Sequence, residues 1–279
     1  MQTIAEILEG AAKHGSIAAA ALHWQAKQNG GSEAAVREEM LRRLRVMRDS
    51  VQAGLDPVLR SVSGRVGGQA ALMNEPTHAG RFGLIGKAGA YALAVAECNA
   101  CMGKIVAAPT AGSCGILPGA LLAAQEDAGF TDDELVDALL VSAAVGRVIA
   151  LQATVSGAEG GCQAECGAAA GMAAAALTAL YGGTARQSAD ACAFALMNML
   201  GLVCDPVHGL VEIPCVYRNV GGVSQALAAA QMALSGVACP IPCDEVIAAM
   251  KDVGDALPPS LRETGDGGCA ACPSQCIGG

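Results

Sequence analysis

The chain has 279 residues, of which 53% are hydrophobic and only 3% aromatic, and its formal net charge is −9. This length and apolar content are ample for a sizeable core, which must be built mainly from Ala, Leu, Val and Met. The acidic balance and the lack of a Lys/Arg-rich tract argue against nucleic acid as a partner.

The two most hydrophobic stretches, 138–158 and 168–181, fall short of a membrane span. The first carries Arg147 and polar residues, and the second is short and mostly Ala, whereas a span needs about 20 strongly apolar residues. We interpret both as buried core helices and expect no membrane partner. No export signal is apparent at the N-terminus, so the 13 cysteines indicate thiol or metal chemistry in the cytoplasm rather than a disulfide scaffold.

Helical patterns follow one another along the chain. Thr3–Glu6 has the form of a capping box that opens a short helix, which Gly15 would end. Residues 33–54 place apolar groups at helical spacing, and the Gly-rich stretch 61–82 is expected to be irregular. Further helices are expected at 84–102, from the capping box Thr131–Glu134 to about residue 150, and at 163–181, 188–203, 222–235 and 244–253.

Alternating apolar and polar residues bounded by turns are almost absent, so few strands are expected. Val211–Ile213 and Val216–Tyr217 could form one short extended segment. The pattern predicts an all-α fold, with residues 1–279 as a single compact helical domain of Ala-rich buried helices and Gly-rich active-site loops. Residues 1–34 are expected to form a peripheral helix, and 262–279 a cysteine-containing C-terminal tail.

Three cysteines stand apart from the others. Cys162, Cys204 and Cys215 each lie beside paired Gly or Pro at the edge of an apolar helical stretch. Such positions can hold a thiolate rigidly around a metal and leave it reachable by a substrate. Three cysteines around an iron–sulfur cluster leave one iron open, and an open metal atom can polarise a substrate oxygen as a Lewis acid.

The remaining cysteines allow simpler interpretations. Cys98 and Cys101 have Cys-x2-Cys spacing, but a lone pair is weak evidence for a metal. Cys166 lies four residues from Cys162, so it can share a helix face with it and stays an alternative ligand. Other cysteines are expected to be small buried apolar residues, namely Cys114, Cys192 and Cys239.

Five segments carry a family resemblance, and they stand in order along the chain. They are Ser-Val-Ser-Gly-Arg-Val-Gly-Gly (61–68), Gly-Lys-Ile-Val-Ala-Ala-Pro-Thr-Ala-Gly-Ser-Cys-Gly (103–115), Ser-Gly-Ala-Glu-Gly-Gly-Cys-Gln-Ala-Glu-Cys-Gly (156–167), Leu-Gly-Leu-Val-Cys-Asp-Pro-Val-His-Gly-Leu-Val-Glu-Ile-Pro-Cys-Val-Tyr-Arg-Asn (200–219) and Leu-Arg-Glu-Thr-Gly-Asp-Gly-Gly (261–268). From about residue 35 onward the sequence resembles the alpha chain of the bacterial iron–sulfur L-serine dehydratases.

The resemblance implies a [4Fe–4S] cluster bound by Cys162, Cys204 and Cys215. In that family a cysteine near the C-terminus can occupy the fourth iron until substrate displaces it. Cys276 is the best counterpart here and Cys272 the second, although the tail departs from family members that end differently.

The implied reaction, part of amino-acid catabolism and gluconeogenesis, converts L-serine to pyruvate and ammonia. The open iron acts as Lewis acid for loss of the hydroxyl, and no pyridoxal phosphate is needed. Nothing around Lys104 looks like a pyridoxal site.

The loop 107–115 offers hydroxyls and backbone N–H groups that can bind a carboxylate. Without the resemblance it reads as a tight helix–helix connection; with it, Thr110, Gly112 and Ser113 are expected to bind the substrate carboxylate, with Lys104 supplying charge. Residues beside the ligands are expected to support them, namely Glu165, Asp205, Glu212, Arg218 and Asn219.

No histidine is an obvious catalytic base. His78 lies in a Gly/Pro-rich loop, and His208 stands between two ligands at a position where family members commonly carry a small residue. The resemblance implies a second, beta-type subunit with its own histidine motif. The catalytic residues of this chain therefore remain unknown, and we expect the general base to come from that beta subunit.

Other functions stay open. An L-cysteine desulfidase uses a related cluster-binding module but has a longer chain. A non-catalytic iron–sulfur or redox-sensing protein would account for the additional cysteines, and a structural zinc protein would use the same ligands. The preference among serine, threonine and cysteine is not evident from the sequence.

Overall fold

The computed structural model describes residues 1–276, apart from the side chains of Ala79, Gln275 and Cys276. Within that range the chain is all-α, as expected, and its only β-type pairing is an isolated parallel bridge between Cys204 and Arg262.

The α-helices lie in chain order at α1 (Ile4–His14), α2 (Ile17–Asn29), α3 (Glu33–Gly54), α4 (Gln69–Met73), α5 (Pro76–Ala79), α6 (Gly83–Ala100), α7 (Ile116–Ala128), α8 (Asp132–Gln152), α9 (Gly157–Gly160), α10 (Ala168–Leu180), α11 (Ala185–Met199), α12 (Cys215–Leu234), α13 (Cys243–Ala256) and α14 (Pro273–Cys276). A π-helical turn, η1 (Gln163–Gly167), precedes α10, and three short 3-10 turns are η2 (Val207–Gly209), η3 (Pro259–Leu261) and η4 (Gly268–Ala271).

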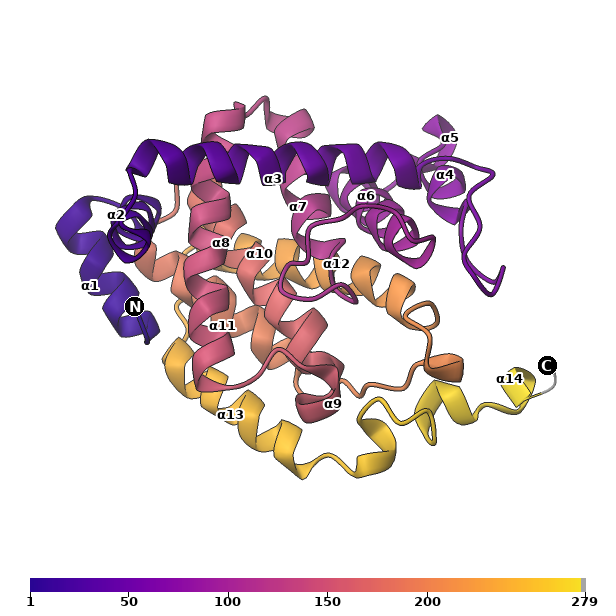
Figure 1. Ribbon diagram of the computed structural model, residues 1–279. Coiled ribbons are helices and arrows are strands. Elements are labelled where there is room, and N and C mark those ends of the chain that lie inside the picture. The colour runs from indigo at the N-terminus through magenta and orange to yellow at the C-terminus, as the bar shows by residue number, and fades with distance from the viewer. Residues whose placement is uncertain (277–279) are drawn as a thin grey trace.

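Helix α10 forms the centre of the molecule. Every residue from Ala168 to Thr178 is buried, as expected for a helix that is apolar on all sides. It packs against α7, α8, α11 and α12, while α3 crosses over α6, α7 and α8 along one side (Figure 1). Helices α1 and α2 lie at one end, α4 and α5 pack on α6 at the other, and α13 leads into the C-terminal tail along the far side from α3 (Figure 1).

Capping side chains set several helix boundaries. Thr131 and Glu134 form the reciprocal capping box expected at the start of α8, and Thr184 with Gln187 forms another at the start of α11. Thr3 accepts a hydrogen bond from the Glu6 N–H at the start of α1. Each such cap satisfies backbone donors that the first helical turn leaves without partners.

The helices predicted from the sequence differ from the observed ones where a helix contains Pro or Gly. No helix was expected between the loop 107–115 and Thr131, yet α7 lies there, and its Pro118 is tolerated because it is in the first turn. The segment Val216–Tyr217 was expected to be extended, which is wrong, because α12 begins immediately after Pro214 and runs through Gly221. The stretch 61–82 contains the two short helices α4 and α5.

The two most hydrophobic stretches are core helices, as expected. They correspond to α8 and α10, and their apolar side chains belong to the main hydrophobic cluster. Arg147 lies on the outer side of α8, where its guanidinium stacks over Trp24 and donates to the Met1 carbonyl. Among the described residues, no helix combines the length and hydropathy needed to cross a bilayer.

Small residues allow the helices to cross closely. At the α6–α7 crossing, a Cβ added to Gly119 would lie 2.7 Å from the Ala88 carbonyl oxygen and 2.8 Å from the Ala92 nitrogen. These neighbours are backbone atoms of a buried helix and have little room to move. The close approach therefore depends on glycine at this position.

We expect Gly119→Ala to destabilise the fold even though Ala is the better helix former. The clash should cost about 1–3 kcal/mol and exceed the helix-propensity gain of about 0.5–1 kcal/mol. Gly221→Ala is the matched control, because no atom lies within 4 Å of its added Cβ, and it should be neutral or stabilising. Urea unfolding monitored by circular dichroism measures both; a Gly119→Ala variant as stable as the wild type would contradict the packing argument.

Candidate functional site

The three singled-out cysteines lie on three different segments. Cys162 follows Gly160 and Gly161 and directly precedes η1, Cys204 lies in the extended stretch after α11, and Cys215 is the first residue of α12. Cys162 and Cys204 are buried, and Cys215 is half-buried. Cys162 and Cys204 are 42 residues apart in sequence, and Cys204 and Cys215 are 11 residues apart. The three thiols nevertheless lie near one another.

Glycine and a buried glutamine hold the first two segments together. Gly161 has φ +73°, and a Cβ there would lie 2.8 Å from the Leu202 carbonyl oxygen, so only glycine is free of strain. The buried Gln163 accepts a hydrogen bond from the Gly201 N–H at 2.9 Å, and its own N–H donates to the Leu202 carbonyl at 2.9 Å. Its amide also donates to the Met250 carbonyl of α13 at 2.8 Å.

The thiols of Cys162, Cys204 and Cys215 lie within electrostatic range of one another. Burial raises the pKa of Cys204 well above its usual range and that of Cys215 to about 12, and a charge on Cys162 raises both further. The pKa of Cys162 itself is lowered, first by a hydrogen bond with Cys166 and also by the nearby Arg218 cation. The two sulfurs of Cys162 and Cys166 are 3.4 Å apart. Burial and mutual repulsion thus keep the thiols of Cys204 and Cys215 protonated until a cation compensates them.

A single metal ion and an iron–sulfur cluster require different spacings of the cysteine sulfurs that bind them. Thiolates around a single zinc lie about 3.8 Å apart; among residues 1–276, no three His, Cys, Asp or Glu side chains are gathered tightly enough for one ion. In an iron–sulfur cluster each cysteine binds a different iron, so its ligands need not touch. Two buried thiols and one half-buried thiol on separate segments, with a cation beside them, are compatible with ligation of a cluster.

Arg218 provides that cation and is itself held in place. Its guanidinium contacts Cys162, donates to the Val203 carbonyl at 2.7 Å and pairs with the Asp205 carboxylate at 2.7 Å. Asp205 is almost fully buried, so the pair is shielded from solvent. The guanidinium therefore lies between the Cys162 thiol and a buried carboxylate.

The C-terminal tail is fastened to the Cys204 segment. The Cys204 N–H donates to the Leu261 carbonyl at 2.9 Å, and the Glu263 N–H donates to the Cys204 carbonyl at 2.7 Å. The Cys269 N–H donates to Asp205 Oδ2 at 2.6 Å. Gly268 has φ +60°, and a Cβ there would lie 2.2 Å from the same oxygen. Of the tail cysteines expected as fourth ligand, Cys272 is exposed, and the side chain of Cys276 lies outside the described residues.

The loop expected to bind the substrate carboxylate packs against the same site. Thr110 Oγ1 donates to Glu165 Oε1 at 2.7 Å and lies 3.1 Å from Ser113 Oγ. Ser113 is fully buried, Thr110 is half-buried and Lys104 is exposed. A Cβ on Gly112 would lie 3.2 Å from Glu165 Oε1. The loop and the thiols thus share one neighbour, Glu165.

Glu165 lies between the loop and Cys204. A Cβ on Gly157 would be 2.6 Å from Glu165 Oε2 and 3.0 Å from Cys204 Sγ, so the missing side chain leaves room beside both. Burial raises the pKa of Glu165, the Thr110 hydroxyl opposes this, and the Glu263 carboxylate adds to the rise. Sequence reasoning expected Glu165 to support the ligands but did not identify Gly157 or Glu263.

Asn219 anchors the loop to α12. Its amide donates to the Gly112 and Cys215 carbonyls and accepts from the Gly115 N–H, each at 2.9 Å. The side chain is fully buried. One residue therefore sets the position of the loop relative to the thiol at the start of α12. The two histidines considered as bases lie elsewhere on the surface: His78 contacts the Leu72 carbonyl, and His208 is exposed in η2.

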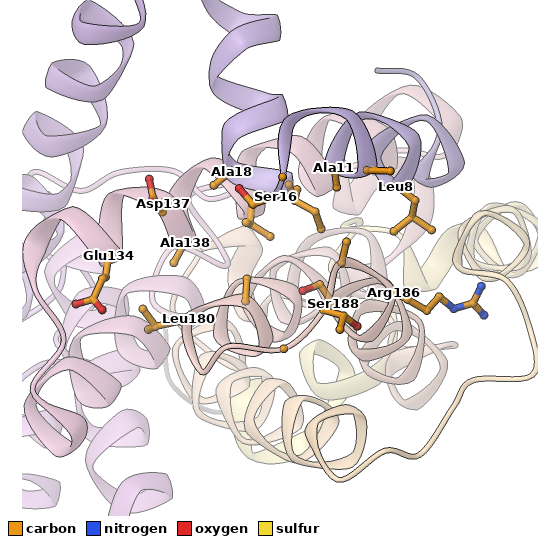
Figure 2. Close-up of a pocket in the computed structure, with 18 residues that line it drawn as sticks. Leu8, Ala11, Ser16, Ala18, Glu134, Asp137, Ala138, Leu180, Arg186 and Ser188 are labelled. Carbon is orange, nitrogen blue, oxygen red and sulfur yellow. The ribbon is translucent and has the colours of Figure 1, made fainter.

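A cavity of about 620 Å³ lies apart from this site, between the α1–α2 turn, α8 and the α10–α11 turn (Figure 2). Its lining is mostly small and apolar, with Ser188, Asp137 and Arg186 among the polar members (Figure 2). None of the site residues expected from the sequence lines it.

Comparisons with known proteins agree on one family. Residues 6–270 match the family described as serine dehydratase alpha chain. The chain is 50% identical over 240 residues to the probable L-serine dehydratase alpha chain of Bacillus subtilis, covering 85% of this chain and 80% of that one. It is 48% identical over 186 residues to the L-serine dehydratase alpha chain of Peptoniphilus asaccharolyticus, covering 67% of this chain and 64% of that one. It is 44% identical over 183 residues to the L-serine dehydratase of Helicobacter pylori, covering 64% of this chain but only 40% of that one.

Asn219→Ala should loosen the loop 110–115, because it leaves the buried Gly115 N–H and the Gly112 carbonyl without their side-chain partner. The expected loss in unfolding free energy is roughly 2–4 kcal/mol, with faster hydrogen exchange at the Gly115 amide. Asn99→Ala is the control: Asn99 contacts the same loop through the Ala111 carbonyl from a more accessible position, so its loss should cost less than about 0.5 kcal/mol. Equal effects of the two substitutions would refute the anchoring role.

Proposed function

The chain belongs to the serine dehydratase alpha chain family, and from this membership we propose that it is the alpha subunit of an iron–sulfur L-serine dehydratase. This lyase converts L-serine to pyruvate and ammonia in the cytoplasm and requires a second, beta-type chain. The observation that carries the proposal is the convergence of the thiols of Cys162, Cys204 and Cys215 beside the Arg218 cation.

We assign these three cysteines as ligands of a [4Fe–4S] cluster. When bound, the cluster supplies an open iron atom that acts as a Lewis acid on the substrate hydroxyl. Arg218 and Asp205 stabilise the negative charge of the ligands and hold the Cys162 side of the site rigid. A tail cysteine, with Cys276 as the candidate, guards the fourth position in the absence of serine; the tail's hydrogen bonds to Cys204 and Asp205 support this.

The substrate carboxylate binds at the loop 107–115. The Thr110 hydroxyl and the Gly112 backbone bind it, Lys104 supplies a positive charge, and Ser113 holds Thr110 in place. Thr110 can donate to the substrate only when Glu165 is protonated and donates to Thr110 Oγ1 in turn. Because burial raises the pKa of Glu165, that carboxyl holds a proton more readily than an exposed one. A protonated Glu165 removes the like-charge repulsion that a substrate carboxylate would otherwise meet. The general base comes from the second chain, and no step uses pyridoxal phosphate.

Cys204→Ala should abolish cluster binding, because a site reduced to two cysteines cannot hold the cluster. Iron and acid-labile sulfide per chain, measured after anaerobic purification, should fall from about four of each to near zero. Cys192→Ala, a buried cysteine on α11, is the matched control and should keep its iron, whereas Cys276→Ala should keep it but lose it faster in air. Equal iron in the wild type and Cys204→Ala would rule out the ligand assignment.

Thr110→Val should weaken serine binding without changing iron content. The substitution keeps the side-chain shape but removes the hydroxyl, so KM for serine should rise about tenfold, which is the value of one hydrogen bond to a charged group. Thr178→Val, which removes a buried hydroxyl bonded within α10, should leave KM unchanged. An unaltered KM in Thr110→Val would remove this residue from the substrate site.

A further inference from the structure

Large apolar side chains are exposed on the loops and short helices before α6, near its start and just after its end. Six of them lie between residues 58 and 102 and are 48–82% exposed. We call this set the apolar face, and it consists of Val58, Val62, Leu72, Phe82, Ile85 and Met102. A single exposed apolar residue is ordinary, but a concentration of them on one segment is typical of an interaction surface.

The segment that carries the apolar face is firmly held. The buried Glu97 carboxylate accepts hydrogen bonds from the backbone N–H groups of Gly67, Gln69 and Ala70 at 3.1–3.2 Å. The Met73 side chain packs on α6, where a Cβ on Gly89 would lie 2.8 Å from its methyl carbon. The exposed side chains are therefore presented by an ordered backbone, which lowers the entropy cost of binding.

The apolar face continues to the thiol site. Ser63, next to Val62, donates from its N–H and its hydroxyl to the Glu212 carboxylate. Glu212 belongs to the segment between Cys204 and Cys215, and its neighbours Leu210 and Val211 are 36% and 40% exposed. A partner bound to the apolar face would therefore also lie beside the loop that carries two of the assigned ligands.

The charge of this region is opposite to that of the chain. Residues 56–104 contain five Lys or Arg and three Asp or Glu, whereas the whole chain has a net charge of −9. One of the three acidic residues, Glu97, is buried and engaged with backbone N–H groups. The segment that carries the apolar face therefore has a small positive charge, part of which Glu126 offsets by pairing with Lys87. A partner with acidic side chains around an apolar centre complements the remainder.

We infer that the apolar face, extended by Leu210 and Val211, binds the second chain of the enzyme through an apolar surface bordered by acidic side chains. The inference rests on the proposed function. The length of the relatives supports this occupant: the matched region covers only 40% of the L-serine dehydratases of Helicobacter pylori and Mycobacterium bovis, so most of those chains consists of other sequence. The relatives in Bacillus subtilis and Peptoniphilus asaccharolyticus are described as alpha chains, which is consistent with a second chain as the occupant of the apolar face.

The test measures the dissociation constant between the purified second chain and variants of this chain. Phe82→Glu and Val62→Glu each place a charge on the apolar face, one at the start of α6 and one beside the Ser63–Glu212 contact. Each should weaken association at least about tenfold, as expected for an apolar side chain that an interface buries. Val237→Glu is the matched control: Val237 is 47% exposed on a different segment, and its variant should bind like the wild type. Circular dichroism and iron content of each variant should not change, because these side chains are on the surface.

A charge variant gives an independent readout. Arg81→Glu should slow association and reduce its dependence on salt, while the dissociation rate changes little. Unchanged affinity for the second chain in Phe82→Glu and Val62→Glu would overturn the inference. It would also be overturned if these variants bound the second chain normally but no longer associated with further copies of this chain. Absence of iron in the wild type would instead refute the proposed function, and the affinity comparison would still report on the apolar face.

Discussion

Close packing of helices through Gly and Ala is the constraint on which the rest of this structure depends. The added-Cβ distances at Gly115 and Gly119 show that α7 meets α6 backbone to backbone, at Ala92 and Ala88. The same is true where Gly54 of α3 meets Ala94 of α6. Such contacts leave no room for side-chain adjustment, so each helix end is fixed in position. The loops attached to these helix ends, including the loop 107–115, are therefore also fixed in position.

Polar side chains join the segments that carry the candidate site through hydrogen bonds. Gln163 joins the Cys162 segment to the Cys204 segment and to α13, and Asn219 joins the loop 110–115 to the start of α12. Arg218 and Asp205 then join the Cys162 and Cys204 segments to the tail. Gln163, Asn219 and Asp205 are buried, and each accepts or donates at least one hydrogen bond across these segments, which makes the arrangement costly to distort. Three segments far apart in sequence are thereby held as one unit.

The proposed cluster site and the proposed docking surface are connected through one contact. Glu212 links the segment between Cys204 and Cys215 to Ser63, and so to the apolar face. Under the proposed function, an open cluster iron would have to be accessible to substrate and yet protected from solvent, and a general base from a partner would have to lie close to the assigned ligands. A docking surface that shares a loop with the thiol site meets both needs, since one association event would cover the site and supply the missing group.

The sequence by itself determined the helical class, most helix boundaries and the identity of the family. The capping box at Thr131 and terminating glycines such as Gly15 act over a single helical turn, so the sequence alone predicts these helix boundaries. The motifs that contain Cys162, Cys204 and Cys215 are continuous in sequence, so the sequence alone also indicates the family. What only the tertiary structure decided is which side chains meet: Glu165 with Thr110 and Gly157, Asn219 with Gly115, and Asp205 with Cys269. The start of α12 at Cys215 and the existence of α7 were also decided there, because burial against neighbouring helices outweighed the local signals of Pro and Gly. Contacts between residues tens to a hundred positions apart depend on the packing of whole helices, and no local pattern encodes them.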